Sequence, residues 1–240
     1  MSIYGNDFYA TMEQGSKRSA EHIVPLLISK YSPKSVVDVG CGTGPFANEF
    51  LKLGVSNVIG YEGQWMESLP TILPKNLYLY TDLTRPLASL RKYDLCLCLE
   101  VAEHLEEANA WTLIETLTEL SEVIVFSAAI PQQGGNHHVN EQWPSYWSEL
   151  FAEKNYFLEW DPRLAIWDNS QIEGCYRQNL LIFSSNAKSR QLKPISLVHP
   201  DLWTEAMKIR RVPLSLRLIS KLPKSVFRFR RSLRKLLRIK

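Results

Sequence analysis

The stretch VVDVGCGTGPFA, residues 36–47, places three glycines at alternate positions directly after a short run of apolar, mostly β-branched residues. That run predicts a buried strand, and PFANEFLKLG (residues 45–54) has the apolar spacing of a helix that ends at Gly54. Glycine permits a tight turn and lets a ligand approach the backbone where a Cβ would intrude. The stretch therefore predicts a strand, a ligand-binding turn and a helix.

The alternation of strand and helix continues beyond this stretch. Further strands are predicted at 57–62, 76–83, 93–101 and 122–130, with helical spacing at 106–120. The run YDLCLCLEV is apolar without alternation, which is typical of a strand buried on both faces of a parallel sheet. We therefore expect an open α/β sheet with helices on both faces, whose strand ends form a ligand-binding edge.

The second half of the pattern predicts the end of the sheet. A helix is expected at 144–155, followed by strands within 156–167 and 175–186 that can pair as an antiparallel hairpin at the edge. The pattern then stops, so we expect one domain at 1–187, with an extension at 188–240.

Acidic residues after the strands indicate which ligand the glycine turn binds. The turn lacks the lysine of a phosphate-binding loop, and its spacing differs from the dinucleotide fingerprint. Asp38 would repel a pyrophosphate, but it suits the ammonium group of an amino-acid-bearing cofactor. Glu62 can accept both ribose hydroxyls, and Asp82 can accept the adenine amine between apolar walls from Leu83 and Trp65. This set indicates S-adenosylmethionine.

The stretches VVDVGCGTG, GYEGQW, YTDL and LCLEVAEHL resemble the successive motifs of class I S-adenosylmethionine-dependent methyltransferases. The resemblance covers residues 20–186 and implies a Rossmann-like, mostly parallel seven-stranded sheet with an antiparallel edge hairpin. The residues expected to bind the cofactor are Asp38, Gly40, Cys41, Gly42, Gly44, Glu62, Gly63, Trp65, Asp82, Leu83 and Glu100. The alternative is a glycine turn that serves only helix packing, with surface acids nearby.

A polar loop, GGNHHVNEQW at 134–143, follows the fifth predicted strand, where this fold places the transferred methyl. Histidine can accept a proton from a hydroxyl, and Asn140 or Glu141 can orient its ring. We predict His138 as the catalytic residue and His137 as the second candidate, because the loop resembles one in methyltransferases of glycan and small-molecule biosynthesis. A purely structural loop is the alternative. Adjacent histidines point to opposite sides of an extended chain, so no metal site is predicted.

Substrate contacts are expected near this loop and from the N-terminal segment. Residues 1–30 are predicted to form a helix that covers the cofactor, with Ser16 and Ser19 as further contacts; a capped helix with a solvated turn is the alternative. A structural role is also the alternative for the histidine of the LEVAEHL motif. The residues expected to bind substrate are Tyr9, His104, Asn140 and Trp143.

Charge divides the chain into two parts. The first 207 residues have a formal charge of −10, because 15 Lys and Arg face 25 acids, whereas 13 Lys and Arg lie from Lys208 onward. Residues 211–240 contain no acid and keep apolar residues at helical spacing, which predicts a basic amphipathic helix. An anionic membrane surface is its favoured partner, and nucleic acid or a protein surface are the alternatives.

These observations predict an enzyme that transfers a methyl group from S-adenosylmethionine to a hydroxyl of a sugar or other small molecule. A membrane-associated glycan precursor is one candidate acceptor. A cytoplasmic location is expected from the lack of a secretory signal and from four cysteines without disulfide or zinc spacing, and the basic tail adds a peripheral position at the inner membrane face. The alternative function is a methyltransferase-like fold that acts as a nucleic-acid-binding or scaffold module. The sequence contains no signal for an oligomeric state.

Overall fold

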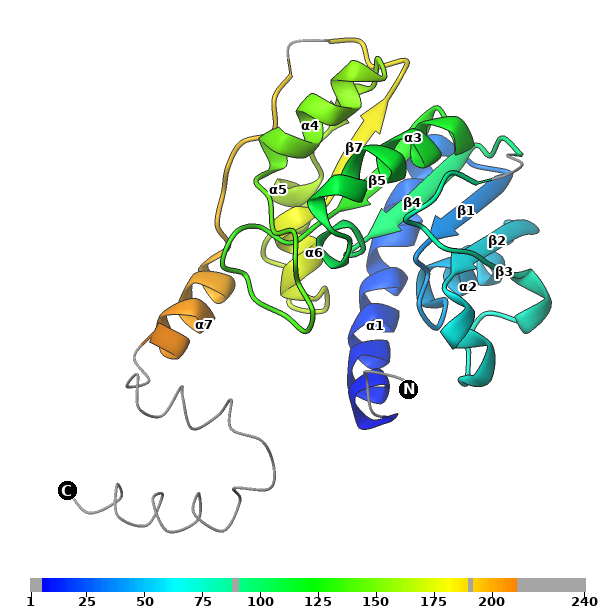
Figure 1. The fold of residues 1–240 in the computed structure, drawn as a ribbon, viewed down its shortest axis with the longest axis horizontal. Coiled ribbons are helices and arrows are strands. Elements are labelled where there is room, and N and C mark those ends of the chain that lie inside the picture. Colours follow the sequence, from blue (N-terminus) through cyan, green and yellow to red (C-terminus); the bar gives the residue numbers. More distant parts are fainter. Residues whose placement is uncertain (1–5, 88–90, 190–191, 211–240) are drawn as a thin grey trace. The chain divides into compact units, whose positions relative to one another are not determined.

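The computed structural model describes the backbone of residues 6–87, 91–189 and 192–210 (Figure 1). The strands are β1 (Ser35–Val39), β2 (Asn57–Glu62), β3 (Tyr78–Tyr80), β4 (Leu95–Leu99), β5 (Val123–Ser127), β6 (Phe157–Trp160) and β7 (Leu181–Ser184). The α-helices are α1 (Asn6–Tyr31), α2 (Pro45–Lys52), α3 (Ala110–Leu120), α4 (Pro144–Glu153), α5 (Arg163–Ile166), α6 (Gly174–Asn179) and α7 (Pro200–Arg210). Short 3₁₀ helices are η1 (Gln64–Ser68), η2 (Lys75–Leu77), η3 (Ala102–His104) and η4 (Glu107–Asn109).

The described strands form one seven-stranded sheet in the order β3-β2-β1-β4-β5-β7-β6. Neighbouring strands from β3 to β5 are parallel, whereas β7 is antiparallel to both β5 and β6. The predicted mostly parallel sheet with an antiparallel edge is confirmed. Because parallel strands share one direction, the residues that follow β1, β2, β4 and β5 gather at one edge of the sheet.

Helices cover both faces of the sheet, as predicted. Successive strand residues point to opposite faces, and two separate cores result. Val36 and Leu97 belong to a core with α1, α2, α5 and α6, whereas Val37 and Cys98 belong to a core with α3 and α4. Figure 1 shows α3 and α4 on the face opposite α1.

One predicted element differs from the structure. The segment expected as a strand at 175–186 begins with α6, and β7 starts only at Leu181. The polar side chains of α6 explain the difference. They are buried, and buried polar groups need hydrogen-bond partners, which here are backbone carbonyl and side-chain groups of other segments. Arg177 donates to the carbonyl of Ile172 (2.9 Å), and Asn179 donates to Glu100 (3.1 Å). The antiparallel edge therefore has α5 and α6 between its two strands in place of a tight hairpin.

The chain after β7 returns to the α5 and α6 helices. Arg163 donates to the carbonyl of Ile195 (2.8 Å), and Gln178 donates to the carbonyl of Leu197 (2.6 Å). The first compact unit extends to His199, beyond the boundary predicted at residue 187, and α7 begins a second unit. The predicted basic helix at 211–240 lies outside the described residues. None of the described helices combines the length and the apolar character that a membrane crossing needs.

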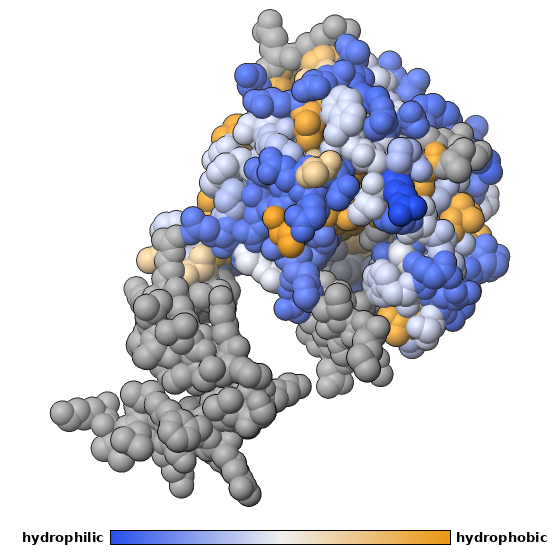
Figure 2. Space-filling view, viewed as in Figure 1, coloured by the Kyte–Doolittle hydropathy of each residue, from blue (hydrophilic) through white to orange (hydrophobic). Residues whose placement is uncertain are grey.

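The described surface is mostly polar. In the view of Figure 2, hydrophilic side chains cover most of the coloured face, and apolar side chains appear in small separate groups. Among the exposed aromatic residues are Trp65 and Trp143, which are 44% and 40% exposed. All four cysteines are free.

Candidate functional site

The glycine turn after β1 has a backbone that other residues rarely adopt. Gly40, Gly42 and Gly44 have φ angles of 72°, 56° and 83°, all in the left-handed region. A Cβ on Gly40 would collide with Val101, and one on Gly44 would collide with Leu73. A Cβ on Gly42 would meet no protein atom within 4 Å. Two of the glycines are thus required by packing, whereas Gly42 faces open space that a ligand can enter.

Glu62 ends β2 and directs its carboxylate back to the turn. Its Oε2 accepts the N–H of Gly42 at 2.7 Å, and its Oε1 accepts the N–H of Gly63 at 2.8 Å. Burial raises the pKa of Glu62, and these two backbone donors partly offset the rise. A carboxylate has about four acceptor positions, so both oxygens keep lone pairs for further donors. Glu62 is therefore fixed beside Gly42 and can still accept a pair of hydroxyls.

Asp38 lies in β1, two residues before the turn, with a side chain that is only 3% exposed. Burial raises its pKa to about 7, while the N–H of Ala47 in the first turn of α2 lowers it and the charge of Glu62 raises it further. A cationic group placed beside this carboxylate would stabilise its ionised form. The ammonium group of the expected cofactor fits this requirement.

The floor of the turn is closed by packing. A Cβ on Gly60 would lie 2.6 Å from Sγ of Cys41, so the absence of a side chain at Gly60 makes room for the thiol. Burial raises the pKa of Cys41, which keeps it protonated. The hydroxyl of Tyr78 donates to the carbonyl of Gly42 at 3.0 Å. Cys41 therefore supports the turn from below with a neutral thiol.

The residues predicted to hold an adenine ring lie at the surface. The ring of Trp65 packs against Gly63, where a Cβ would collide with Nε1, and Leu83 is half-buried. Asp82 is exposed, and its Oδ1 accepts the N–H (3.0 Å) and the hydroxyl (2.6 Å) of Thr84, which lower its pKa. Trp65 has a partly exposed aromatic ring, whereas Asp82 is held in a surface turn.

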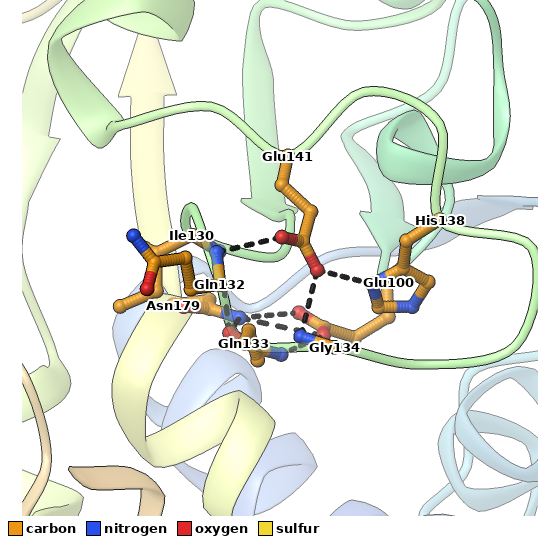
Figure 3. A network of polar contacts seen from close by, with 8 residues as sticks. All are labelled: Glu100, Ile130, Gln132, Gln133, Gly134, His138, Glu141 and Asn179. Atoms are coloured by element: carbon orange, nitrogen blue, oxygen red, sulfur yellow. Dashed lines mark hydrogen bonds and ion pairs between the residues drawn. The ribbon is translucent and has the colours of Figure 1, made fainter. Parts of the chain in front are cut away.

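Glu100 directly follows β4 and is the centre of a polar network (Figure 3). Its φ of 54° is unusual for a residue other than glycine, and its N–H donates to the carbonyl of Ser127 at 2.9 Å. Its carboxylate accepts Nδ2 of Asn179 at 3.1 Å and Nε2 of Gln133 at 3.3 Å. Sequence reasoning missed these two amides, although polar residues directly before the apolar run LLIF were a signal for Asn179.

His138 has one ring nitrogen fixed by a carboxylate. Its Nδ1 lies 3.0 Å from Oε1 of Glu141, and the ring is largely buried. Glu141 also accepts the N–H groups of Gln132 and Gly134, each at 2.7 Å (Figure 3). We assign the proton of the neutral ring to Nδ1 from this contact, which leaves a lone pair on Nε2. The predicted orientation of the ring by Glu141 agrees with this geometry.

The two adjacent histidines of the loop have different positions. His137 has a φ of 58° and an exposed side chain, and its backbone carbonyl accepts a hydrogen bond from the ring of His104. The rings of His104 and His138 meet edge to face, with centroids 4.9 Å apart. Burial is the main cause that lowers the pKa of His104, and the charge of the neighbouring His138 lowers it further. The structure thus brings His104 and His138 together and directs the His137 side chain elsewhere.

Glu103 in η3 is a further residue that sequence reasoning overlooked. It is fully buried, and among the described residues neither of its carboxyl oxygens has a hydrogen bond of good geometry, although the carboxyl group of Glu100 and the backbone of Ala129 lie beside it. Burial and the neighbouring Glu100 raise its pKa well above the usual range. Glu103, His104 and His138 each offer one ligand atom, and these atoms lie within 4.8 Å of one another. The glutamate directly before His104 in LEVAEHL was the available signal.

The remaining predicted substrate residues are dispersed. Asn140 is buried, with Oδ1 accepting Nε2 of Gln142 at 3.0 Å, and Trp143 is exposed at the start of α4. Ser19 is fully buried, where its hydroxyl donates to the carbonyl of Gly15 at 2.8 Å. The hydroxyl of Ser16 contacts the hydroxyl of a buried tyrosine of α6 at 3.1 Å. The side chain of Tyr9 lies outside the described residues. Ser16 and Ser19 therefore bind other parts of the protein.

Comparisons with known proteins give one family. A family model described as a methyltransferase domain matches residues 13–159. No match was found among curated proteins. Among solved structures, S-adenosylmethionine-bound CalS10, an amino pentose methyltransferase from Micromonospora echinaspora involved in calicheamicin biosynthesis, has a TM-score of 0.57 and 14% identity, over 78% of this chain and 99% of that chain. TnmH has a TM-score of 0.50 and 15% identity, over 75% of this chain and 57% of that chain.

The solved structures show a likeness of fold alone, whereas the family model covers more than half of the chain. The glycine turn and the buried carboxylates of Asp38 and Glu62 fit the cofactor of that family, because Gly42 opens beside them. The chain belongs to the methyltransferase domain family and is a class I S-adenosylmethionine-dependent methyltransferase.

Proposed function

We propose that this methyltransferase acts on a hydroxyl oxygen of a sugar or another small molecule. The observation that carries the proposal is the pairing of His138 with Glu141 in the loop after β5, which assigns the proton of the neutral ring to Nδ1 and makes Nε2 the acceptor. A nitrogen or sulfur acceptor needs less help with its proton than a hydroxyl, whose pKa is far above neutral. An oriented imidazole is the group that suits activation of a hydroxyl.

The cofactor is assigned to the glycine turn. S-adenosylmethionine supplies a methyl group bonded to a positively charged sulfur. We assign its ammonium group to Asp38 and its ribose hydroxyls to Glu62. The open space beside Gly42 is assigned to the same cofactor. The support is that both carboxylates are buried and that only Gly42 of the three turn glycines opens to free space.

The acceptor side is assigned to the loop after β5 and to the stretch from Glu100 to His104. The acceptor oxygen forms a bond to the methyl carbon as the carbon–sulfur bond breaks, and the electron pair of that bond stays on sulfur. The hydroxyl proton has to leave during this displacement, and His138 assists its departure. Trp143, exposed near this loop, offers an aromatic face of the kind that stacks on sugar C–H groups.

The test uses the full chain in two steps. Calorimetric titration measures binding of S-adenosylmethionine and of its demethylated product, and labelled cofactor then measures methyl transfer to a panel of sugars, phenols and amines. We expect cofactor binding and transfer to a hydroxylated acceptor. His138→Ala should reduce that transfer roughly 100-fold or more, while His22→Ala, at an exposed position of α1, should not change it. Lack of cofactor binding, or transfer to amines alone that does not depend on His138, would overturn the proposal.

We further propose that residues 211–240 attach the enzyme to an anionic membrane surface, where a glycan precursor is the acceptor. The support is the sequence: no acid occurs in this segment, and apolar residues keep helical spacing between Lys and Arg. Co-sedimentation with phosphatidylglycerol vesicles, but not with phosphatidylcholine vesicles, is expected. The triple change Arg228→Glu, Arg231→Glu, Arg234→Glu should abolish it. Binding of the full chain to duplex DNA without binding to anionic vesicles would contradict this assignment and favour a nucleic-acid role.

A further inference from the structure

We propose that Glu103, His104 and His138 bind a divalent first-row transition-metal cation beside the methyl-transfer site. One carboxylate oxygen and two imidazole nitrogens lie within 4.8 Å of one another. Ligands at about 2.1 Å from a shared ion lie roughly 3 to 3.5 Å apart. A closure of about 1 Å would bring the three atoms to bonding distance of one ion.

The side chain of Glu103 is the strongest indication of a missing partner. It is 0% exposed, and in the described part of the chain neither oxygen has a hydrogen bond of good geometry, although the carboxyl group of Glu100 and the backbone of Ala129 lie beside it. The carboxyl group of Glu100 lies beside that of Glu103, so two carboxyl groups face each other in a buried position. Such a pair is stable only when a proton or a cation lies between or beside its oxygens. A cation would satisfy both oxygens of Glu103.

Both histidines are oriented as metal ligands are. Metal-binding histidines usually donate their second ring nitrogen to a carboxylate or a backbone carbonyl, which fixes the ring and its tautomer. His138 makes such a contact with Glu141 (3.0 Å), and the ring of His104 makes one with the carbonyl of His137. Each histidine therefore keeps one nitrogen for a ligand bond.

The backbone holds the loop and η3 in register. The carbonyl of Glu103 accepts the N–H of Val139 at 2.8 Å and the N–H of Asn140 at 3.1 Å. Both bonds are made by the two residues directly after His138, so the residue that supplies the carboxylate also fixes the segment that supplies the second histidine. The arrangement of the three ligands thus depends on backbone contacts that do not require a cation.

The ligand set selects a class of ion. Two imidazoles and one carboxylate suit Mn²⁺, Fe²⁺, Co²⁺ or Zn²⁺ better than Mg²⁺ or Ca²⁺, which prefer oxygen ligands. Three protein ligands leave coordination positions open for other molecules. The open positions are the chemical reason to expect a functional site, since structural sites are usually closed by a fourth protein ligand.

The catalytic consequence rests on the proposed function, whereas cation binding does not. A hydroxyl oxygen of the acceptor that occupies an open position would have a lowered pKa, so its proton passes to water. The oxygen then takes the methyl group, and the electron pair of the carbon–sulfur bond stays on sulfur. In this form of the site His138 assists the departure of the proton as a metal ligand, and Glu141 holds its ring in place.

Binding is tested without any activity assay. The full-length protein is freed of metals by chelation and dialysis and titrated with Mn²⁺, with free Mn²⁺ followed by electron paramagnetic resonance, and with Co²⁺, followed by its visible absorption. We expect one ion per chain. Glu103→Gln, which preserves shape, and His104→Asn should each weaken binding at least tenfold. Glu106→Gln and His22→Ala, at exposed positions outside the triad, should not change it.

Each outcome separates this proposal from the proposed function. Failure to bind one ion per chain, or equal affinity in Glu103→Gln and the unchanged protein with both folded by circular dichroism, would overturn the cation site. If one of these variants does not fold, the other decides. Methyl transfer that persists after chelation would overturn the catalytic consequence while leaving the site. Cation binding without binding of S-adenosylmethionine would support the site and overturn the proposed function.

Discussion

Oε1 of Glu141 lies 3.0 Å from Nδ1 of His138, and both oxygens of this glutamate also accept backbone N–H groups of the same loop. One carboxylate therefore sets the fold of the loop and the orientation of the imidazole together. A glutamine side chain has only one acceptor oxygen, so it cannot accept these three donors through two oxygens as Glu141 does. Replacing Glu141 with glutamine is therefore informative.

Glu141→Gln is expected to lower kcat about 10- to 100-fold, the range found when a group that orients a functional histidine is removed. The affinity for S-adenosylmethionine should change little, because Glu141 is not in the glycine turn. Steady-state kinetics and cofactor titration check this. Glu149→Gln, at an exposed position of α4, is the control. An unchanged kcat in Glu141→Gln, together with an inactive His138→Ala, would show that the ring does not depend on this contact.

Asp38 links cofactor binding to pH. Burial raises its pKa from 3.8 to about 7, so below neutral pH this carboxylate is protonated and cannot pair with an ammonium group. The affinity for S-adenosylmethionine should therefore fall as the pH decreases through about 7. Titrations between pH 5.5 and 8.5 check this. Asp38→Asn should bind the cofactor about 10- to 100-fold more weakly, since a charged hydrogen bond contributes roughly 1.5 to 3 kcal/mol, and its affinity should lose the pH dependence.

The same carboxylate affects stability in the opposite sense. Between about pH 4 and pH 7 the folded protein keeps a proton on Asp38 that the unfolded chain has released, so the free energy of unfolding falls as the pH rises. The loss is about 4 kcal/mol at most. Without cofactor, Asp38→Asn is expected to be more stable than the unchanged protein at pH 8, as measured by urea unfolding. Lower stability of Asp38→Asn at pH 8 would contradict this account.

Gly42 and Gly54 form a matched pair. Both have positive φ angles, 56° and 94°, and at both a Cβ would meet no atom within 4 Å. Alanine should therefore cost roughly 1 kcal/mol of stability at either position, from backbone strain. Only Gly42→Ala should weaken binding of S-adenosylmethionine, by about tenfold or more, because its methyl group enters the space assigned to the ligand. Equal affinity of the two variants for S-adenosylmethionine would contradict the assignment of the space beside Gly42 to the cofactor.

Arg163 connects α5 to the segment that returns after β7. Its side chain is 0% exposed, Nη2 lies 2.6 Å from Oδ2 of Asp161, and it also donates to the carbonyl of Ile195. Arg163→Ala should lower the free energy of unfolding by about 3 kcal/mol, because it leaves a carboxylate and a carbonyl without their donor. Arg18→Ala, which breaks an exposed pair with Glu173, should cost less than about 1 kcal/mol. Similar losses in the free energy of unfolding in the two variants would contradict the argument that burial makes the Arg163 contacts the stronger ones.

The parts of the fold that follow from local rules were predictable from the sequence. Three glycines between an apolar strand and a helix permit a tight turn, and an apolar run without alternation is typical of a strand buried on both faces. The start of β7 was not predictable in the same way. Its preceding residues Arg177, Gln178 and Asn179 are buried only because carbonyls and a carboxylate from other segments lie within reach.

The candidate site shows the same limit. The approach of Glu103 to His138 depends on how the loop after β5 returns to η3, where two backbone N–H groups meet one carbonyl. No residue pattern encodes that return. His137 and His138 are adjacent in the sequence, but the ring that lies next to His138 in space is that of His104. The polar composition of the loop was visible in the sequence, but its geometry was not.

The contact between Gly40 and Val101 has a consequence for engineering the enzyme. Val101 packs so closely against Gly40 that a side chain at Gly40 would collide with it. In the sequence, Val101 stands between Glu100 and the 3₁₀ helix that carries Glu103 and His104. Val101 thus contacts the turn assigned to the cofactor and belongs to the stretch assigned to the acceptor. Exchanging the loop at 134–143 for that of another methyltransferase is a route to new acceptors, provided that Val101 and the glycine beside it are transferred or kept as a unit.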